Sequence, residues 1–160
     1  MTDRRIVITG IGVISPLGND LASTWEAMKA GRSGIDTIKS MDVTGYSTKI
    51  AGEVNDPAPY FKTPKDARRV DRFTHFAMGA AGMALKDSGL DLEAEDKTRI
   101  GVMVGSGIGG LGTLESQHAT LLSKGPARVS PFMIPYMISN IASGLISMEY
   151  GLGGPNMSIV

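Results

Sequence analysis

Short apolar runs and helix-period patterns alternate along this chain. Residues 5–14 are rich in Ile and Val, which predicts a strand buried on both faces, as in a parallel sheet. Pro16 and Gly18 end that run. A second buried strand is predicted at residues 100–104, and a third at residues 157–160.

The first predicted helix follows the first strand. Asn19 is expected to cap it, because an Asn side chain can accept a hydrogen bond from the first turn. Leu21, Trp25 and Met28 fall on one face, and Gly31 suits the left-handed position after the last turn.

Three more helical patterns follow later in the chain. One begins near Asp71 and stops at Gly89, one covers residues 113–122, and one covers residues 139–149. Strands that alternate with helices indicate an α/β architecture with a mainly parallel sheet.

Residues 32–62 are irregular in pattern, which predicts a surface excursion. Within it, residues 48–53 predict a short strand, and the proline-rich residues 56–59 predict a turn. Thr63 and Pro64 are expected to open a short helix, because proline is favoured in a first helical turn.

Composition narrows the function classes. The 160 residues are 42% hydrophobic and 20% charged, with a formal net charge of zero, so the chain is globular and has no general attraction for nucleic acid. The sequence contains no cysteine. Within these residues this excludes disulfides, a thiolate nucleophile and cysteine-ligated metals. Gly10 and Gly12 interrupt the apolar N-terminal run, which argues against a signal peptide. No apolar run in the sequence reaches the roughly 18 residues that span a membrane. We therefore expect a cytoplasmic protein that binds neither nucleic acid nor membrane.

Glycines 105, 107 and 110 satisfy a dinucleotide-binding spacing between a strand and a helix. The acidic residue expected about 20 residues later is missing, because Gly125 and Pro126 stand there. A nucleotide-dependent oxidoreductase therefore remains only as an alternative, which nicotinamide titration would test.

Glu115 and His118 have the spacing of a di-iron ligand pair on one helical face. Such a site needs a second copy, and His75 has no acidic residue three positions before it. We expect a solvated helix face here, with no metal and no cofactor.

Two features stay open on residue chemistry alone. The basic residues near position 68 form either an ordinary charged surface or a site for an acidic protein or phosphate. The proline-interrupted apolar residues 131–138 suit core packing, an oligomer interface or a pocket for a flexible alkyl chain.

Four motifs in order resemble the N-terminal part of the β-ketoacyl-acyl-carrier-protein synthases. They are VITGIGVISPLG at residues 7–18, GSGIGGLG at 105–112, SPFMIP at 130–135 and YGLGGP at 150–155. Ile108 resembles the type II, long-chain enzymes of this family, since the type I relative typically has glycine there.

The resemblance implies a thiolase-like layered αβαβα fold with mixed, mainly parallel sheets, built from two similar halves and working as a homodimer. Residues 1–160 would supply the N-terminal half and end before the turn that carries the nucleophilic cysteine. Two histidines later in such proteins complete the catalytic set. His75 and His118 match neither of them, so we expect no catalytic residue within this chain.

The implied activity is decarboxylative Claisen condensation of an acyl-enzyme thioester with malonyl-acyl carrier protein, in fatty acid chain elongation. The alternative is a non-catalytic partner subunit of the chain-length-factor kind, which keeps the scaffold but replaces the cysteine.

The resemblance also assigns substrate and partner residues. Ile108 would gate the acyl channel, and Met133, Ile134 and Ile138 would line the deep end of the partner subunit's acyl pocket. Docking of the acidic acyl carrier protein would fall to the basic residues Lys65, Arg68 and Arg69, with Lys124 and Arg128 as additions.

Overall fold

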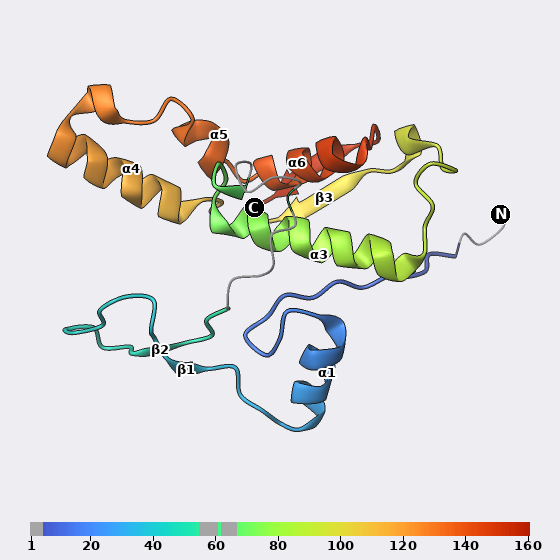
Figure 1. Cartoon of the computed structure of the whole chain (residues 1–160), viewed down its shortest axis with the longest axis horizontal. Coiled ribbons are helices and arrows are strands. Elements are labelled where there is room, and N and C mark those ends of the chain that lie inside the picture. The colour runs from blue at the N-terminus through green and yellow to red at the C-terminus, as the bar shows by residue number, and fades with distance from the viewer. Residues whose placement is uncertain (1–4, 55–60, 62–66) are drawn as a thin grey trace. The chain divides into compact units, whose positions relative to one another are not determined.

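The computed structural model describes residues 5–54, 61 and 67–160 (Figure 1). The chain divides into two compact units, Met1–Ala58 with Gly79–Leu90, and Pro59–Met78 with Asp91–Val160. The turn expected at residues 56–59, the short helix expected at Thr63 and Pro64, and Lys65 lie outside the described residues. No helix in the described part of the chain is long and apolar enough to cross a membrane.

The first unit contains helix α1 (Leu21–Lys29) and an antiparallel pair of short strands, β1 (Asp36–Thr37) and β2 (Ile50–Ala51). Strand β2 confirms the strand predicted at residues 48–53. The predicted cap of α1 was wrong by one residue, because Oδ1 of Asp20 accepts from the Ser23 N–H at 2.7 Å.

Helix α1 buries a different face from the one its apolar residues suggest. Thr24 and Ala27 are buried, whereas Trp25 and Met28 are exposed. The Thr24 hydroxyl donates to the Gly18 carbonyl at 3.2 Å, so this face packs closely on the preceding turn and needs small side chains. Gly31, with φ +62°, takes the left-handed position expected after the helix.

The buried strand predicted at residues 5–14 is wrong. In the described chain this segment joins neither of the two strand pairs, and Ile6 is 92% exposed. Burial on both faces requires neighbours on each side of the strand, and apolar residues alone do not supply them. Instead, Gly10 and Gly12 lie against the backbone of Ala84 and Ala80, where any Cβ would collide with helix α3.

Helix α3 (Arg72–Ser88) confirms the long helix expected between Asp71 and Gly89. Gly89 has φ +65° and follows the last turn directly. Thr74 and Met78 are fully buried on this helix.

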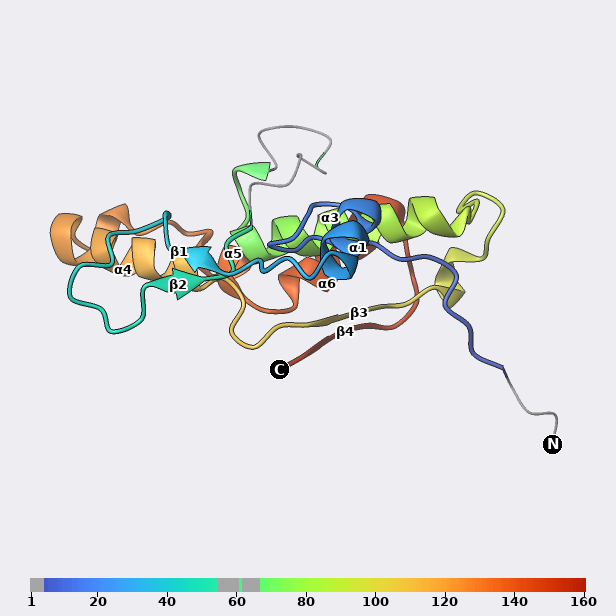
Figure 2. The ribbon, with the colours of Figure 1, turned by 90° about the horizontal axis from the view of Figure 1, so that it is seen from below.

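The second unit is organised around two parallel strands, β3 (Val102–Gly105) and β4 (Asn156–Ile159), which Figure 2 shows side by side. Both strands were predicted. The burial expected for the first of them was wrong, because inner and outer residues alternate and Met103 is 58% exposed. Helix α6 packs on this strand pair and covers one face.

The remaining elements of this unit are helical: α4 (Leu111–Lys124), α5 (Met133–Met137) and α6 (Ile141–Tyr150), with 3₁₀ turns at Lys97–Arg99 and Pro126–Arg128. Helices α4 and α6 confirm the two later helices predicted from the sequence. Asn156 anchors β4 to α6, because its Nδ2 donates to the Ser143 carbonyl at 2.8 Å while the Ser143 hydroxyl donates to its Oδ1 at 2.9 Å.

Candidate functional site

The glycine-rich loop between β3 and α4 lies where the two parallel strands end. The Ser106 N–H donates to the Ile159 carbonyl at 3.0 Å, so the pairing of β3 with β4 continues into the loop. Open α/β sheets bind ligands at the carboxyl ends of their strands. The residues that follow Gly105 and Ile159 therefore share the edge at which a site is expected.

Ile108 stands at the tip of this loop and is 66% exposed. The turn beneath it is closed by the Gly109 N–H, which donates to the Ser106 Oγ at 3.0 Å. Gly109 has φ +81°, a left-handed conformation that residues with an L side chain rarely adopt. The loop therefore presents the Ile108 side chain outward from a compact turn.

The loop also contacts helix α5. The Gly110 N–H donates to the Met137 carbonyl at 2.8 Å. A Cβ at Gly110 would lie 2.8 Å from the Met137 Cα, and one at Gly109 would collide with the Met137 carbonyl oxygen. The structure thus brings the Ile108 loop against the segment that carries Met133, Ile134 and Ile138.

These contacts account for Gly110 in the dinucleotide-like spacing, whereas a Cβ at Gly105 or Gly107 would meet no atom within 4 Å. The glycines of a dinucleotide site would have to leave room for a pyrophosphate near the start of the helix. Gly110 is buried, and protein backbone fills the space beside it that a pyrophosphate would need. The Gly110 N–H is already bonded to the Met137 carbonyl. The Thr113 N–H, in the first turn of α4, is bonded to a carboxylate.

The three apolar residues predicted to line an acyl pocket do not converge within one chain. Met133 is half-buried and borders a groove of about 430 Å³ between α4 and the residues that follow it. Ile134 and Ile138 are exposed and do not border that groove. Met133 and Ile134 are neighbours on the short helix α5 and point in different directions, and Ile138 follows the last helical residue in an extended conformation.

A second groove, of about 360 Å³, was not predicted. Its walls are mostly apolar and come from the start of α3, from α5 and from α6, with Arg69 and Glu149 as the charged residues. Pro135 and Tyr136 line this groove, whereas Met133, from the same segment, lines the groove beside α4. The apolar run at residues 131–138 indicated that a pocket was possible. The helical conformation of this segment determines that Met133 borders one groove while Pro135 and Tyr136 border the other.

The basic residues of the predicted docking patch are exposed where the structure describes them. Arg68 and Arg69 precede α3, and Arg69 borders the apolar groove. Lys124 and Arg128 lie together with Thr120 around a shallow hollow of about 670 Å³. None of these four cations forms an ion pair with another described residue.

Asp71 is a site residue that the sequence did not reveal. Its Oδ2 accepts from the Thr113 N–H at 2.7 Å and from the Thr113 hydroxyl at 2.8 Å. Helix α4 begins after Gly110, which has no side chain to cap it, so Asp71 provides the acceptor from elsewhere in the chain. The partners are 42 residues apart, and no local pattern links them.

Neither histidine belongs to a possible metal site in the part of the chain that the structure describes. Among the described residues, no group of three or more His, Asp or Glu side chains could hold a metal ion. Nε2 of His75 lies 2.8 Å from the Ala67 carbonyl, and its ring packs edge-on against Phe61 at 5.1 Å between centroids. Glu115 and His118 are exposed on α4, as expected for a solvated helix face.

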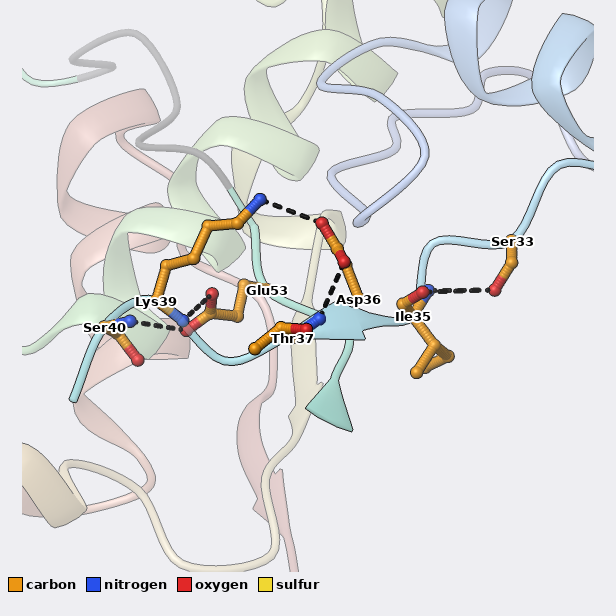
Figure 3. A network of polar contacts seen from close by, with 7 residues as sticks. All are labelled: Ser33, Ile35, Asp36, Thr37, Lys39, Ser40 and Glu53. Atoms are coloured by element: carbon orange, nitrogen blue, oxygen red, sulfur yellow. Dashed lines mark hydrogen bonds and ion pairs between the residues drawn. The ribbon is translucent and has the colours of Figure 1, made fainter. Parts of the chain in front are cut away.

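Shifted pKa values occur in the first unit, in a polar network around β1 (Figure 3). Hydrogen bonds from Ser40, whose N–H donates to Oε1 at 3.0 Å, and from the Lys39 N–H, which donates to Oε2 at 2.8 Å, lower the pKa of Glu53 below its ordinary value. The Lys39 ammonium, 2.8 Å away, and the Thr37 N–H lower the pKa of Asp36 in the same way. All of these groups are solvent-exposed, so the network fixes the strand pair and does not create a buried reactive group.

Solved ketosynthases share this fold. The ishigamide ketosynthase/chain length factor aligns with a TM-score of 0.85 at 26% identity, over 96% of this chain and 39% of that one. A second match, titled AntDE:AntF, is a type II PKS acyl-carrier protein in complex with its ketosynthase. It aligns with a TM-score of 0.70 at 25% identity, over 96% of this chain and 40% of that one. The structure therefore has part of the layered, thiolase-type α/β fold of ketosynthases.

Residues 3–160 match the family described as Beta-ketoacyl synthase, N-terminal domain, and the chain belongs to that family. A relative from Coxiella burnetii, named 3-oxoacyl-[acyl-carrier-protein] synthase 2, is 47% identical over 161 residues. The alignment covers 100% of this chain and 39% of that protein, so this chain spans well under half the length of the relative. The resemblance seen in the four sequence motifs is confirmed.

Proposed function

We propose that this chain is the N-terminal part of a type II 3-oxoacyl-acyl-carrier-protein synthase. The observation that carries the proposal is the shared sheet edge, where the Ser106 N–H is bonded to the last residue of β4. Ile108 follows β3 at this edge, and the family resemblance puts a nucleophilic cysteine in the turn after β4. The 47% identity with a protein of this name supports the assignment.

The chemistry requires a thiolate at that turn. A cysteine at the N-terminus of a helix has a lowered pKa, and the helix amides stabilise the oxyanion of the attacked thioester. The acyl group moves from the carrier thiol to the cysteine sulfur, and the carrier thiol leaves. Malonyl thioester then loses carbon dioxide, and the resulting enolate carbon attacks the acyl-enzyme. This step releases the cysteine thiolate and a 3-oxoacyl thioester two carbons longer.

In this proposal the residues of the chain select the acyl group. Ile108 projects from the loop at the shared edge and, being β-branched, has few side-chain conformations. A long acyl chain passes only when this side chain moves. The exposed Ile134 and Ile138, with Met133, would be covered by a second copy in a homodimer and complete its acyl pocket.

The proposed carrier partner is an acidic acyl carrier protein. Arg68, Arg69, Lys124 and Arg128 are exposed cations without ion-pair partners among the described residues, and Lys65 belongs to the same proposed patch. Exposed charges of one sign steer a partner of opposite charge and raise the association rate. The AntDE:AntF structure contains a ketosynthase with its carrier protein, which supports this kind of partner. The expected cytoplasmic location, without nucleic-acid or membrane partners, stays a prediction.

The test uses the full-length protein with acyl- and malonyl-carrier substrates. We expect mass spectrometry to show an acyl group on one cysteine, followed by release of a 3-oxoacyl thioester two carbons longer. Absence of both species with folded protein and competent substrates would refute the proposal. Absence of a cysteine at the turn after β4 would instead identify the non-catalytic partner subunit.

A further inference from the structure

Asp71 joins the beginning of one helix to the beginning of another within the second unit. Its backbone carbonyl accepts from the Thr74 N–H at 3.0 Å, so it occupies the position from which an aspartate normally caps its own helix. Its carboxylate bonds to Thr113 of α4, through both the N–H at 2.7 Å and the hydroxyl at 2.8 Å. The side chain therefore stabilises α4, although the residue belongs to the start of α3.

This bond holds one end of the Ile108 loop. Thr113 lies in the first turn of α4, directly after the loop, and Asp71 also packs on Gly110, where a Cβ would lie 2.9 Å from its own. The other end of the loop is held at Ser106, whose N–H donates to Ile159 and whose Oγ accepts from Gly109. Ile108 thus lies in the loop between two anchored ends.

The room for movement lies between these anchors. A Cβ at Gly107 would meet no atom within 4 Å, whereas Gly109 and Gly110 are tightly packed against Met137. A displacement of Ile108 must therefore either be absorbed near Gly107 or strain the contacts at Gly110 and Thr113. If the loop moves by straining the contacts at Gly110 and Thr113, the energy required depends on the strength of the hydrogen bonds between Asp71 and Thr113.

We propose that Asp71 is a positioning residue for the Ile108 gate. By holding the first turn of α4, it limits how far the loop moves when an acyl chain passes, and so contributes to chain-length discrimination. This inference rests on the proposed function, because Ile108 acts as a gate only if the protein binds an acyl chain.

The experiment compares Asp71→Ala with Asp71→Asn in the full-length protein, using single-turnover acylation by short- and long-chain acyl-carrier thioesters. In Asp71→Ala we expect the ratio of the long-chain to the short-chain second-order rate constant of acylation to rise about tenfold, because a hydrogen bond to a charged group is lost and the loop moves more easily. Asp71→Asn keeps an acceptor oxygen and should recover most of the original ratio. Thr113→Ser, which retains both donors, should resemble the unmodified protein, and Thr113→Val should fall between.

Asp20→Ala is the matched control. Asp20 caps α1 in the first unit through a bond of the same kind, 2.7 Å from the Ser23 N–H. This variant should lose helix stability without changing the chain-length ratio. Hydrogen exchange of residues 106–113, followed by mass spectrometry, supplies a readout that needs no activity, and it should be faster in Asp71→Ala than in Asp20→Ala.

The outcomes separate this inference from the proposed function. An unmodified protein that accepts no acyl group overturns the proposed function and the gate together. Normal acylation with the same chain-length ratio in Asp71→Ala overturns the positioning role alone. Unchanged loop exchange in Asp71→Ala shows that the bond does not hold the loop, and also overturns it.

Discussion

The Gly110 N–H donates to the Met137 carbonyl at 2.8 Å, and this bond joins the glycine loop to helix α5. The two backbones approach so closely that no side chain fits between them. The loop that presents Ile108 is therefore shaped by a neighbouring helix as well as by its own glycines.

Gly110→Ala should destabilise the protein by about 1 to 3 kcal/mol, because the new methyl group would overlap packed backbone that cannot move independently. Its Cβ would lie 2.8 Å from both the Met137 Cα and the Tyr136 carbonyl oxygen. Urea denaturation of the full-length protein measures the change. Gly107→Ala is the control, since a Cβ there has open space, and equal losses for both variants would contradict the packing argument.

Ile108→Phe should impair acylation by long-chain substrates more than by short-chain substrates, because a larger ring obstructs a channel that only long chains must enter fully. We expect about a tenfold difference in kcat/KM, the effect of about 1.4 kcal/mol. Leu122→Phe, at an exposed apolar residue of α4, provides the control. If Ile108→Phe reduced both rates equally while the fold stayed intact, Ile108 would not act as a gate.

Reversing the charges of Arg68 and Arg69 should raise the apparent KM for carrier-bound acyl groups. The effect should be largest at low salt, since screening weakens exposed charges, and free thioester substrates should be nearly unaffected. Steady-state kinetics at several salt concentrations measures it. Arg32→Glu, an exposed arginine of the first unit, is the control. An unchanged KM at low salt would remove the docking role.

Glu53 should titrate below the ordinary glutamate value of 4.5, because Ser40 and the Lys39 N–H stabilise its charged form. A lowered pKa in the folded protein means that this stabilisation is present above the unfolded pKa. It is lost as the pH falls through the folded pKa. NMR titration of the Glu53 carboxyl carbon measures the value. Ser40→Pro, which removes the Ser40 N–H that donates to Oε1, should raise this pKa toward 4.5, whereas Thr37→Ala should leave it in place, because Thr37 contributes its backbone N–H to Asp36 instead.

The local elements of this protein were largely predictable from its sequence. Gly31, Gly89 and Gly151 end helices in left-handed conformations, and a glycine after an apolar pattern is a local signal. Strands β3 and β4 also follow from short apolar runs with clear ends. Arg68 and Arg69 are exposed, and their docking role, which comes from the family resemblance, stays a prediction.

The arrangement of the site depended on contacts between distant residues. Ile6 belongs to an apolar run that suits a buried strand, yet it has no strand beside it in the described chain, because pairing is a property of two segments. Met133 faces a different groove from Pro135 because the segment turns into a helix.

The sequence alone determined the family, the order of most helices and strands, and the residues offered for acyl and carrier recognition. It did so because helix caps, apolar periods and motif spacings are local in the chain. The tertiary structure decided how Asp71 holds Thr113 and how Met137 fills the space beside Gly110. Those contacts form only when segments far apart in the chain pack together, and the position of Ile108 depends on them.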